Sequence, residues 1–281
     1  MRETKHLVRT VLLTLCALSG VALVSALSPA RALDGTDTPA SIKPALPLYK
    51  NSLHALNQAI EGLRAGDAAS SIDALKYAAA GGQSLAQWKL GRMYAAGEGV
   101  PHDDAKAYDY FLQIVNNYDE DTASRREIGI VASAYVAVGV YSLNGLPQVQ
   151  LKADVSRARE LFHFAASTFG DSNAQYNLAR IYLDAAGVKR DPRQAAGWLY
   201  LAAEKNHTES QALLGNLLFT GQGVQKNRAR GLMYLTMAVE NAGEDPKNRW
   251  VAELREKALK AASDGERQAA GDLLVQYISR R

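Results

Sequence analysis

The chain has 281 residues, with 32 lysines and arginines, 29 aspartates and glutamates, and a formal net charge of +3. Four basic residues and one acidic residue lie in the first 32 positions, so the remaining chain carries 28 charges of each sign. A balanced chain has no bulk electrostatic attraction for nucleic acid or for an anionic membrane, so neither is expected as a partner.

Residues 1–32 have the pattern of a secretory signal peptide. A basic start is followed by an apolar run and by Ala30-Arg31-Ala32, which predicts cleavage near Ala32 and a mature protein in the periplasm. A retained membrane anchor is the alternative, since about eighteen apolar residues can just cross a bilayer. Gly20 and the small residues at the end of the run favour cleavage, after which no stable membrane insertion is expected.

The next segment, residues 33–47, is predicted to be a flexible N-terminal tail, because it contains three prolines and no apolar periodicity. The cysteine of the chain, Cys16, precedes this tail. A mature chain without cysteine needs no disulfide and tolerates an oxidising compartment. Its stability has to come from a core, which about 250 residues can supply.

The rest of the chain contains copies of one pattern. Clear copies begin at Ala86, Ala174 and Ser210, and a degenerate copy begins at Ala134. The clear copies combine an apolar helical pattern, a glycine-rich loop that ends in valine, and an aspartate or asparagine that opens a second helix. Self-similarity with a period of about 36 residues predicts an all-α fold, an α-solenoid of stacked helix pairs.

The first helix of each copy carries a small residue where the apolar pattern predicts a helix interior. This position is filled by Gly91, Gly139, Ala179 and Gly215. Glycine inside a helix costs about 1 kcal/mol relative to alanine, and a close approach of the paired helix would offset that cost. The pattern therefore predicts a tight seam within each helix pair.

Glycines such as Gly97 and Gly99 predict the end of the first helix, because glycine readily adopts the left-handed conformation found there. The valines after these glycines are expected to plug the loop into the core, at Val100, Val188 and Val224. The second helix is predicted to begin at a side chain that caps its first turn, namely Asp103, Asp154, Asp191 or Asn227.

These motifs resemble Sel1-like repeats, a branch of the tetratricopeptide-like α-solenoids. The resemblance covers residues 67–242 and is strongest over residues 174–206. It implies a solenoid over residues 48–242, whose first helix pair comes from residues 48–65 and 66–82.

Two segments depart from the repeat. Longer connections at residues 116–130 and 146–153 are expected to interrupt the regular stack. Residues 243–281 are predicted to form two closing helices that cap it with charged side chains.

No catalytic, cofactor-binding or metal-binding site is expected. The serines lie in no GxSxG or SxxK motif, and the glycine-rich loops lack the strand and the lysine of a phosphate loop. The histidines of the mature chain form no HxxxH or HExxH pair and have no cysteine beside them: His54, His102, His163 and His207. Structural or surface roles are favoured for all four.

A solenoid without catalytic groups is expected to bind partners on the face lined by its first helices. In tetratricopeptide-type geometry, the groove residues lie about three before, one after and four after the small position. The partner-binding candidates are Trp88, Arg92, Tyr176, Arg180, Asn216 and Phe219. Aromatic and arginine side chains are enriched among interface hot spots. Packing on the adjacent helix is the favoured alternative for Trp88 and Tyr176, whereas partner contact is favoured for Arg92 and Arg180.

Over its whole length the chain is also similar to the family of periplasmic negative regulators of exopolysaccharide production in rhizobia and their relatives (ExoR). The resemblance implies a protein that binds the periplasmic sensor domain of a membrane histidine kinase and holds that kinase inactive. It also implies removal of the regulator by a periplasmic protease. Two alternatives remain. One is a generic periplasmic scaffold for envelope assembly, and the other is a β-lactam-binding enzyme of the kind credited to cysteine-rich Sel1-like proteins, whose disulfide framework is absent here.

Overall fold

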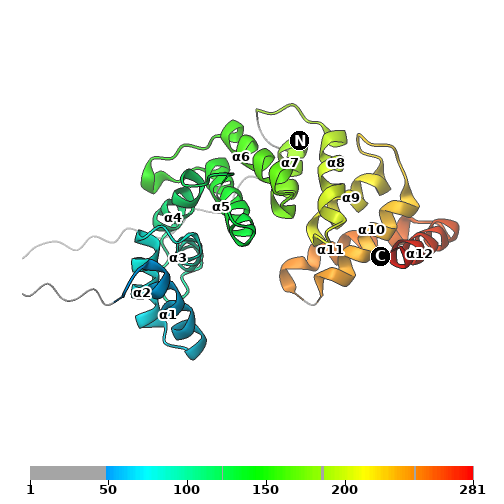
Figure 1. Cartoon of the computed structure of the whole chain (residues 1–281). Helices are drawn as coiled ribbons and strands as arrows, with labels where there is room; N and C mark the ends of the chain where they lie inside the picture. The colour runs from blue at the N-terminus through cyan, green and yellow to red at the C-terminus, as the bar shows by residue number, and fades with distance from the viewer. Residues whose placement is uncertain (1–48, 122, 185–186, 244, 281) are drawn as a thin grey trace, which may run out of the picture. The chain divides into compact units, whose positions relative to one another are not determined.

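The computed structural model describes residues 49–121, 123–184, 187–243 and 245–280. The expected signal peptide (1–32) and tail (33–47) lie outside these residues. The described residues form α-helices joined by loops, and no β-strand occurs among them (Figure 1). The all-α prediction is confirmed. The helices are α1 Ser52–Ala65, α2 Ala68–Ala80, α3 Ser84–Ala96, α4 Asp104–Asn116, α5 Arg125–Asn144, α6 Val155–Thr168, α7 Ser172–Asp184, α8 Pro192–Ala203, α9 Thr208–Thr220, α10 Arg228–Ala242, α11 Arg249–Ala261 and α12 Asp264–Ser279, with short 3-10 turns at Pro147–Val149 and Pro246–Asn248.

Consecutive helices pack as hairpins (Figure 1). The most extensive contacts join α1 to α2, α3 to α4, α5 to α6, α7 to α8 and α9 to α10, and each hairpin also contacts the next one along the chain. Contact between successive repeats is the organisation of a solenoid. The predicted stack of helix pairs is confirmed, and α1 with α2 form the early pair expected from residues 48–82.

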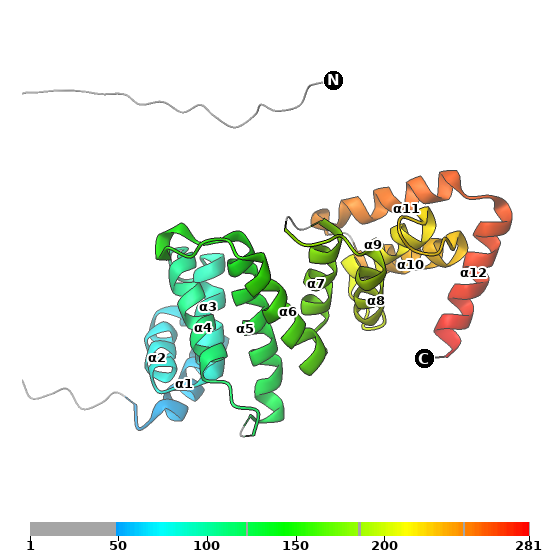
Figure 2. The same cartoon turned by 90° about the horizontal axis from the view of Figure 1, so that it is seen from above.

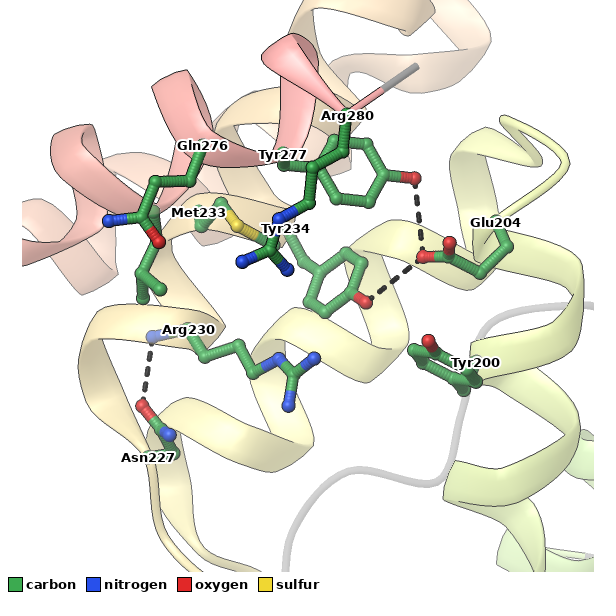
Figure 3. A pocket seen from close by; sticks show the side chains of 10 residues that line it. Tyr200, Glu204, Asn227, Arg230, Met233, Tyr234, Gln276, Tyr277 and Arg280 are labelled. Atoms are coloured by element: carbon green, nitrogen blue, oxygen red, sulfur yellow. Dashed lines mark hydrogen bonds between the residues drawn. The ribbon is translucent and has the colours of Figure 1, made fainter.

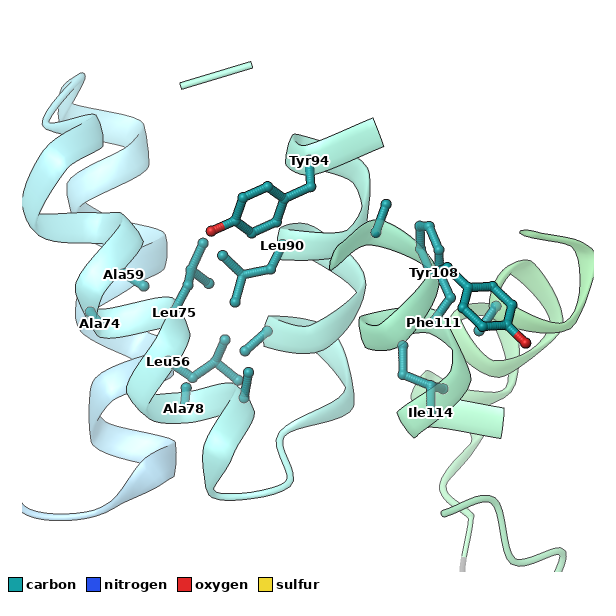
Figure 4. Close-up of a cluster of buried hydrophobic side chains, with 14 of the residues drawn as sticks. Leu56, Ala59, Ala74, Leu75, Ala78, Leu90, Tyr94, Tyr108, Phe111 and Ile114 are labelled. Carbon is teal, nitrogen blue, oxygen red and sulfur yellow. The ribbon is translucent and has the colours of Figure 1, made fainter. Parts of the chain in front are cut away.

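The core lies within and between these hairpins. In the N-terminal hairpins, Leu56, Leu75 and Leu90 extend from α1, α2 and α3 into one cluster (Figure 4). Burial of a leucine side chain contributes about 1.5–3 kcal/mol. Ala59 and Ala78 are fully buried in the same cluster, and such short side chains let α1 and α2 approach closely.

In the next two hairpins, the small residue of the first helix lies against an aromatic ring of the second. A Cβ atom added at Gly91 would lie 2.8 Å from the ring of Phe111, and one added at Gly139 would lie 2.5 Å from the ring of Phe162. Real Cβ atoms essentially never make contacts under 3.0 Å. The predicted seam is therefore confirmed, because neither position has room for a side chain.

The C-terminal seams follow the same rule with different residues. Ala179 of α7 and Leu199 of α8 are fully buried in one cluster, so this hairpin has a methyl group at the small position and a leucine in the same core. In α9 and α10 the backbones themselves meet. A Cβ atom added at Gly215 would lie 2.8 Å from the carbonyl oxygen of Gly231.

The loop and capping predictions are also confirmed. Gly97 and Gly99 have φ of 70° and 74°, in the left-handed region. The Asp103 carboxylate accepts a hydrogen bond from the Lys106 backbone N–H at 3.0 Å, and this bond lowers the pKa of Asp103 below its ordinary value. Equivalent caps are made by Asp154, Asp191 and Asn227. The three plug valines are half-buried against the core clusters.

Buried glutamines in the first helices were not predicted. Gln87, Gln175 and Gln211 are each at most 3% exposed. Their amide nitrogens donate to backbone carbonyl oxygens near the end of the preceding hairpin, at Ala79, Ala166 and Ala203 respectively. The last carbonyl groups of a helix have no partner within the helix. Each glutamine therefore supplies a bond between successive repeats.

The connection expected at residues 116–130 is shorter than predicted. The helix α5 begins at Arg125, where Ser124 and Glu127 form a capping box, and Glu127 also accepts a hydrogen bond from Ser84 of α3 at 3.0 Å. Within the described residues, α5 is the helix that is long and apolar enough to cross a bilayer. It contacts α3, α4, α6 and α7, so it packs on both sides within the stack of hairpins.

The two closing helices are present. The helix α11 contacts α9 and α10, and α12 turns back onto α10 (Figure 2). Ser263 and Glu266 form a capping box at the start of α12. The last helix therefore packs against the final repeat.

We expect Gly215→Leu to lower the free energy of unfolding by about 1–3 kcal/mol, because its side chain must displace the α10 backbone. The matched control is Gly197→Leu in α8, where an added Cβ atom meets nothing within 4 Å. Since leucine is the better helix former by up to about 1 kcal/mol, the control should gain stability. Urea unfolding measures both changes, and a midpoint that rises in Gly215→Leu contradicts the seam.

A second prediction concerns the cap of α8. The Asp191 side chain accepts hydrogen bonds from the backbone N–H groups of Arg193 and Gln194 at 3.1 and 3.0 Å. Asp191→Ala removes both bonds and should cost about 1 kcal/mol in thermal or urea unfolding. Asp191→Asn keeps an acceptor and should retain most of the stability, so equal losses in the two variants would argue against a capping role.

Candidate functional site

The two candidate arginines each stack on the aromatic residue one turn before them. The guanidinium carbon of Arg92 lies 5.0 Å from the centroid of the Trp88 ring in α3, and that of Arg180 lies 5.7 Å from the Tyr176 ring in α7. Both separations are those of a cation–π interaction. The same pair thus recurs at the same position of two repeats, three residues before and one residue after Gly91 and Ala179.

The aromatic member of each pair packs toward the following repeat. The Trp88 indole N–H donates to the Ser133 hydroxyl of α5 at 3.1 Å. The Tyr176 ring centroid lies 5.1 Å from that of His207, the residue that caps α9. Both rings are half-buried, and burial raises the pKa of the Tyr176 hydroxyl. These rings join neighbouring repeats and leave only part of their surface for a partner.

The arginine members are exposed. Within the described residues, neither Arg92 nor Arg180 forms an ion pair with a carboxylate. Arg92 lies with Trp88 and Lys89 at the edge of a hollow of about 370 Å³. Leu63 of α1, Ala68 of α2 and the acidic residue Glu98 also line it. An arginine that stacks on a ring still presents guanidinium donors that suit a carboxylate. This arrangement can bind an acidic side chain of a protein partner.

The candidates in α9 have different surroundings. Asn216 is half-buried. Phe219 is 9% exposed and lies in a core cluster with Ala258 of α11, and the Arg228 guanidinium covers its ring at 4.5 Å. The closing helices fill the position that would face a groove in a longer stack. Phe219 is therefore a core residue and does not belong to the exposed surface expected from the sequence.

A second hollow, of about 520 Å³, lies among α8, α10 and α12 (Figure 3). The carboxylate of Glu204, at the end of α8, accepts hydrogen bonds from the hydroxyls of Tyr234 and Tyr277 at 3.3 and 3.2 Å. Arg230 of α10 and Arg280 at the end of α12 both extend into it. This hollow could not be predicted from the repeat pattern, because α12 lies outside the repeats.

The histidines have structural surroundings where the contacts define them. The Nδ1 atom of His207 accepts a hydrogen bond from the Ser210 backbone N–H at 3.2 Å, and its Nε2 atom lies 3.2 Å from the Asn173 side-chain oxygen. Burial lowers the pKa of this imidazole, which favours the neutral form that the cap requires. In the part of the chain that the structure describes, no three His, Cys, Asp or Glu side chains group to hold a metal ion.

Comparison with known proteins agrees with this architecture. The family model described as "Sel1 repeat" matches residues 84–117, 132–167, 172–207 and 208–242, which are the hairpins from α3 to α10. The exopolysaccharide production negative regulator of Rhizobium meliloti is 32% identical over 208 residues, which cover 74% of this chain and 75% of that protein. The chain belongs to this family of Sel1-repeat proteins.

Two further relatives support the same assignment. The protein of the same name from Rhizobium leguminosarum is 32% identical over 209 residues, covering 74% of this chain and 75% of that protein. Among solved structures, c5321, a protective antigen of uropathogenic Escherichia coli with an SLR fold, matches with a TM-score of 0.65 and 25% identity. That match covers 82% of this chain and 46% of c5321, so the chain spans about half of that protein.

Proposed function

We propose that this protein is an exported negative regulator of exopolysaccharide production that acts by binding another protein. The observation that carries the proposal is its 32% identity, over three quarters of their length, to proteins named for that role. The partner we propose is the periplasmic sensor domain of a membrane histidine kinase, which the regulator holds inactive until a periplasmic protease removes the regulator.

The repeat architecture supports binding as the mode of action. Stacked helix hairpins create extended surfaces suited to protein partners. Arg92 and Arg180 present cationic groups at repeated positions, and each is oriented by an aromatic ring. A sensor domain with carboxylates at a matching spacing would engage both, since guanidinium–carboxylate pairs form two parallel hydrogen bonds. We propose no enzymatic activity for the chain.

A general scaffold for envelope assembly is the competing function, and a β-lactam-binding enzyme is a weaker one. Affinity capture from membranes separates the first two, because a regulator should retain one inner-membrane kinase and a scaffold should retain several envelope proteins. Turnover of a β-lactam by the purified protein would favour the enzyme.

The arginine pair provides the direct test. Truncation of a hot-spot residue commonly costs 2 kcal/mol or more, so Arg92→Ala with Arg180→Ala should weaken sensor-domain binding by roughly a thousandfold if the losses add. Because both side chains are exposed, the double variant should keep its melting temperature. In a deletion strain, it should leave exopolysaccharide production as high as an empty vector does.

The matched control is Arg193→Ala, which removes another exposed arginine from α8 and should restore full repression. A folded double variant that also represses fully would exclude this surface as the binding site. If the double variant has a lower melting temperature and also fails to repress, the two arginines have a structural role instead.

Export gives a separate prediction. Cleavage near Ala32 should produce a periplasmic protein whose first residue is Leu33, as read by N-terminal sequencing of the protein from osmotic-shock fluid. Membrane-bound protein that retains Met1 would contradict both the cleavage and the periplasmic location.

A further inference from the structure

The hollow among α8, α10 and α12 has the volume of a small-ligand site, and its lining includes none of the residues proposed to contact the protein partner. Its volume of about 520 Å³ falls in the range of about 300–1,000 Å³ that is common for ligand pockets. It is also unrepeated, because it needs the last helix to turn back over α10 (Figure 3). A seam between ordinary repeats would recur along the chain.

The side chains that line this hollow include two arginines and one glutamate. Arg230 and Arg280 approach it from different helices, and both are exposed. Across the described residues, neither guanidinium is placed in an ion pair with a carboxylate. The acidic residue of the lining, Glu204, is held by two tyrosine hydroxyls. Two arginines from separate elements that line one hollow supply it with donors suited to a planar anion such as a carboxylate.

The other side chains that line the hollow indicate what kind of group would be attached to the carboxylate of the ligand. The ring of Tyr200 is 41% exposed beside the hollow, and Met233 and Leu273 add apolar surface. Gln276 adds a side-chain amide that can bond to a hydroxyl group. A rigid ring fits against an exposed tyrosine better than a flexible chain does, because it loses little conformational freedom on binding.

We propose that this hollow binds a small organic acid in which a carboxylate is attached to a ring. Arg230 and Arg280 hold the carboxylate, and the ring lies against Tyr200 and the apolar side chains of α10 and α12. The hydrogen bonds from Tyr234 and Tyr277 hold Glu204 in the wall of the hollow.

The test uses the whole protein as isolated from cells. Two acids are each compared with a neutral counterpart. D-Glucuronate is compared with D-glucose, and 4-hydroxybenzoate with 4-hydroxybenzamide, by isothermal titration calorimetry. We expect at least one acid to bind saturably and its neutral counterpart to bind at least about tenfold more weakly. Equal affinity for acid and neutral compound, or no saturable binding of either acid at millimolar concentration, overturns the proposal.

Substitutions of the two arginines test whether the acid binds in this hollow. Arg230→Gln with Arg280→Gln should weaken the bound acid by at least about tenfold at unchanged melting temperature, whereas Arg193→Gln, an exposed arginine of α8 outside the hollow, should leave its affinity unchanged. Affinity that is unchanged in the double variant places the acid elsewhere and overturns the proposal.

A third experiment tests whether a peptide, and not a small molecule, supplies the carboxylate, and it uses a glutamate tetrapeptide as the ligand. If only the peptide binds, and binds through the two arginines, the carboxylate comes from a polypeptide and the small-molecule assignment is wrong.

Discussion

The hairpins α3–α4 and α5–α6 depend on a match in size between one position in the first helix and one position in the second. Gly91 and Gly139 face the rings of Phe111 and Phe162, and a Cβ atom at either glycine would overlap the ring. Protein interiors are packed so closely that adding or removing one methyl group disturbs the packing. The match therefore fixes the distance between the two helices and the rotation of the first helix about its axis. Residues three before and one after the small position then lie on one side of that helix, outside the seam.

The seam, the loop glycines and the capping residues could be predicted because each depends on local chemistry. A glycine amid an apolar helical pattern, or an aspartate just before one, has few physical roles, and repetition along the chain selects among them. The buried glutamines could not be predicted in the same way. Gln87 or Gln211 alone has the appearance of a surface residue, and its carbonyl partner belongs to the preceding hairpin. Recurrence of alanine-glutamine or serine-glutamine at the start of three first helices was the available signal.

Where the repeat is broken, sequence periodicity ceases to determine structure. The early start of α5 depends on a capping box between Ser124 and Glu127 and on a bond from Ser84 of another helix, so a segment without repeat pattern still becomes helical. Phe219 occupies a groove position by register, but α11 covers it. The path of α12 is set by tertiary packing on α10. The capping box is local and has a sequence signature, Ser-x-x-Glu. The contacts of Ser84, Phe219 and α12 join segments far apart in the chain, and the C-terminal hollow exists because of the last one.

The two candidate surfaces differ in how the fold produces them. The hollow beside Arg92 is built from α1, α2 and α3, whereas the C-terminal hollow is built from α8, α10 and α12, so they share no helix. Helices of a solenoid are stabilised by their nearest neighbours, and distant substitutions without shared partners have nearly additive effects. The tight seams of α3 to α6 leave little room for one helix to slide on another, since a glycine would have to move past a ring. The physical expectation is therefore that binding at Arg92 is independent of the C-terminal hollow. Arg180 lies on α7, which packs against α8 of that hollow, so any coupling between the two surfaces should pass through the α7–α8 hairpin.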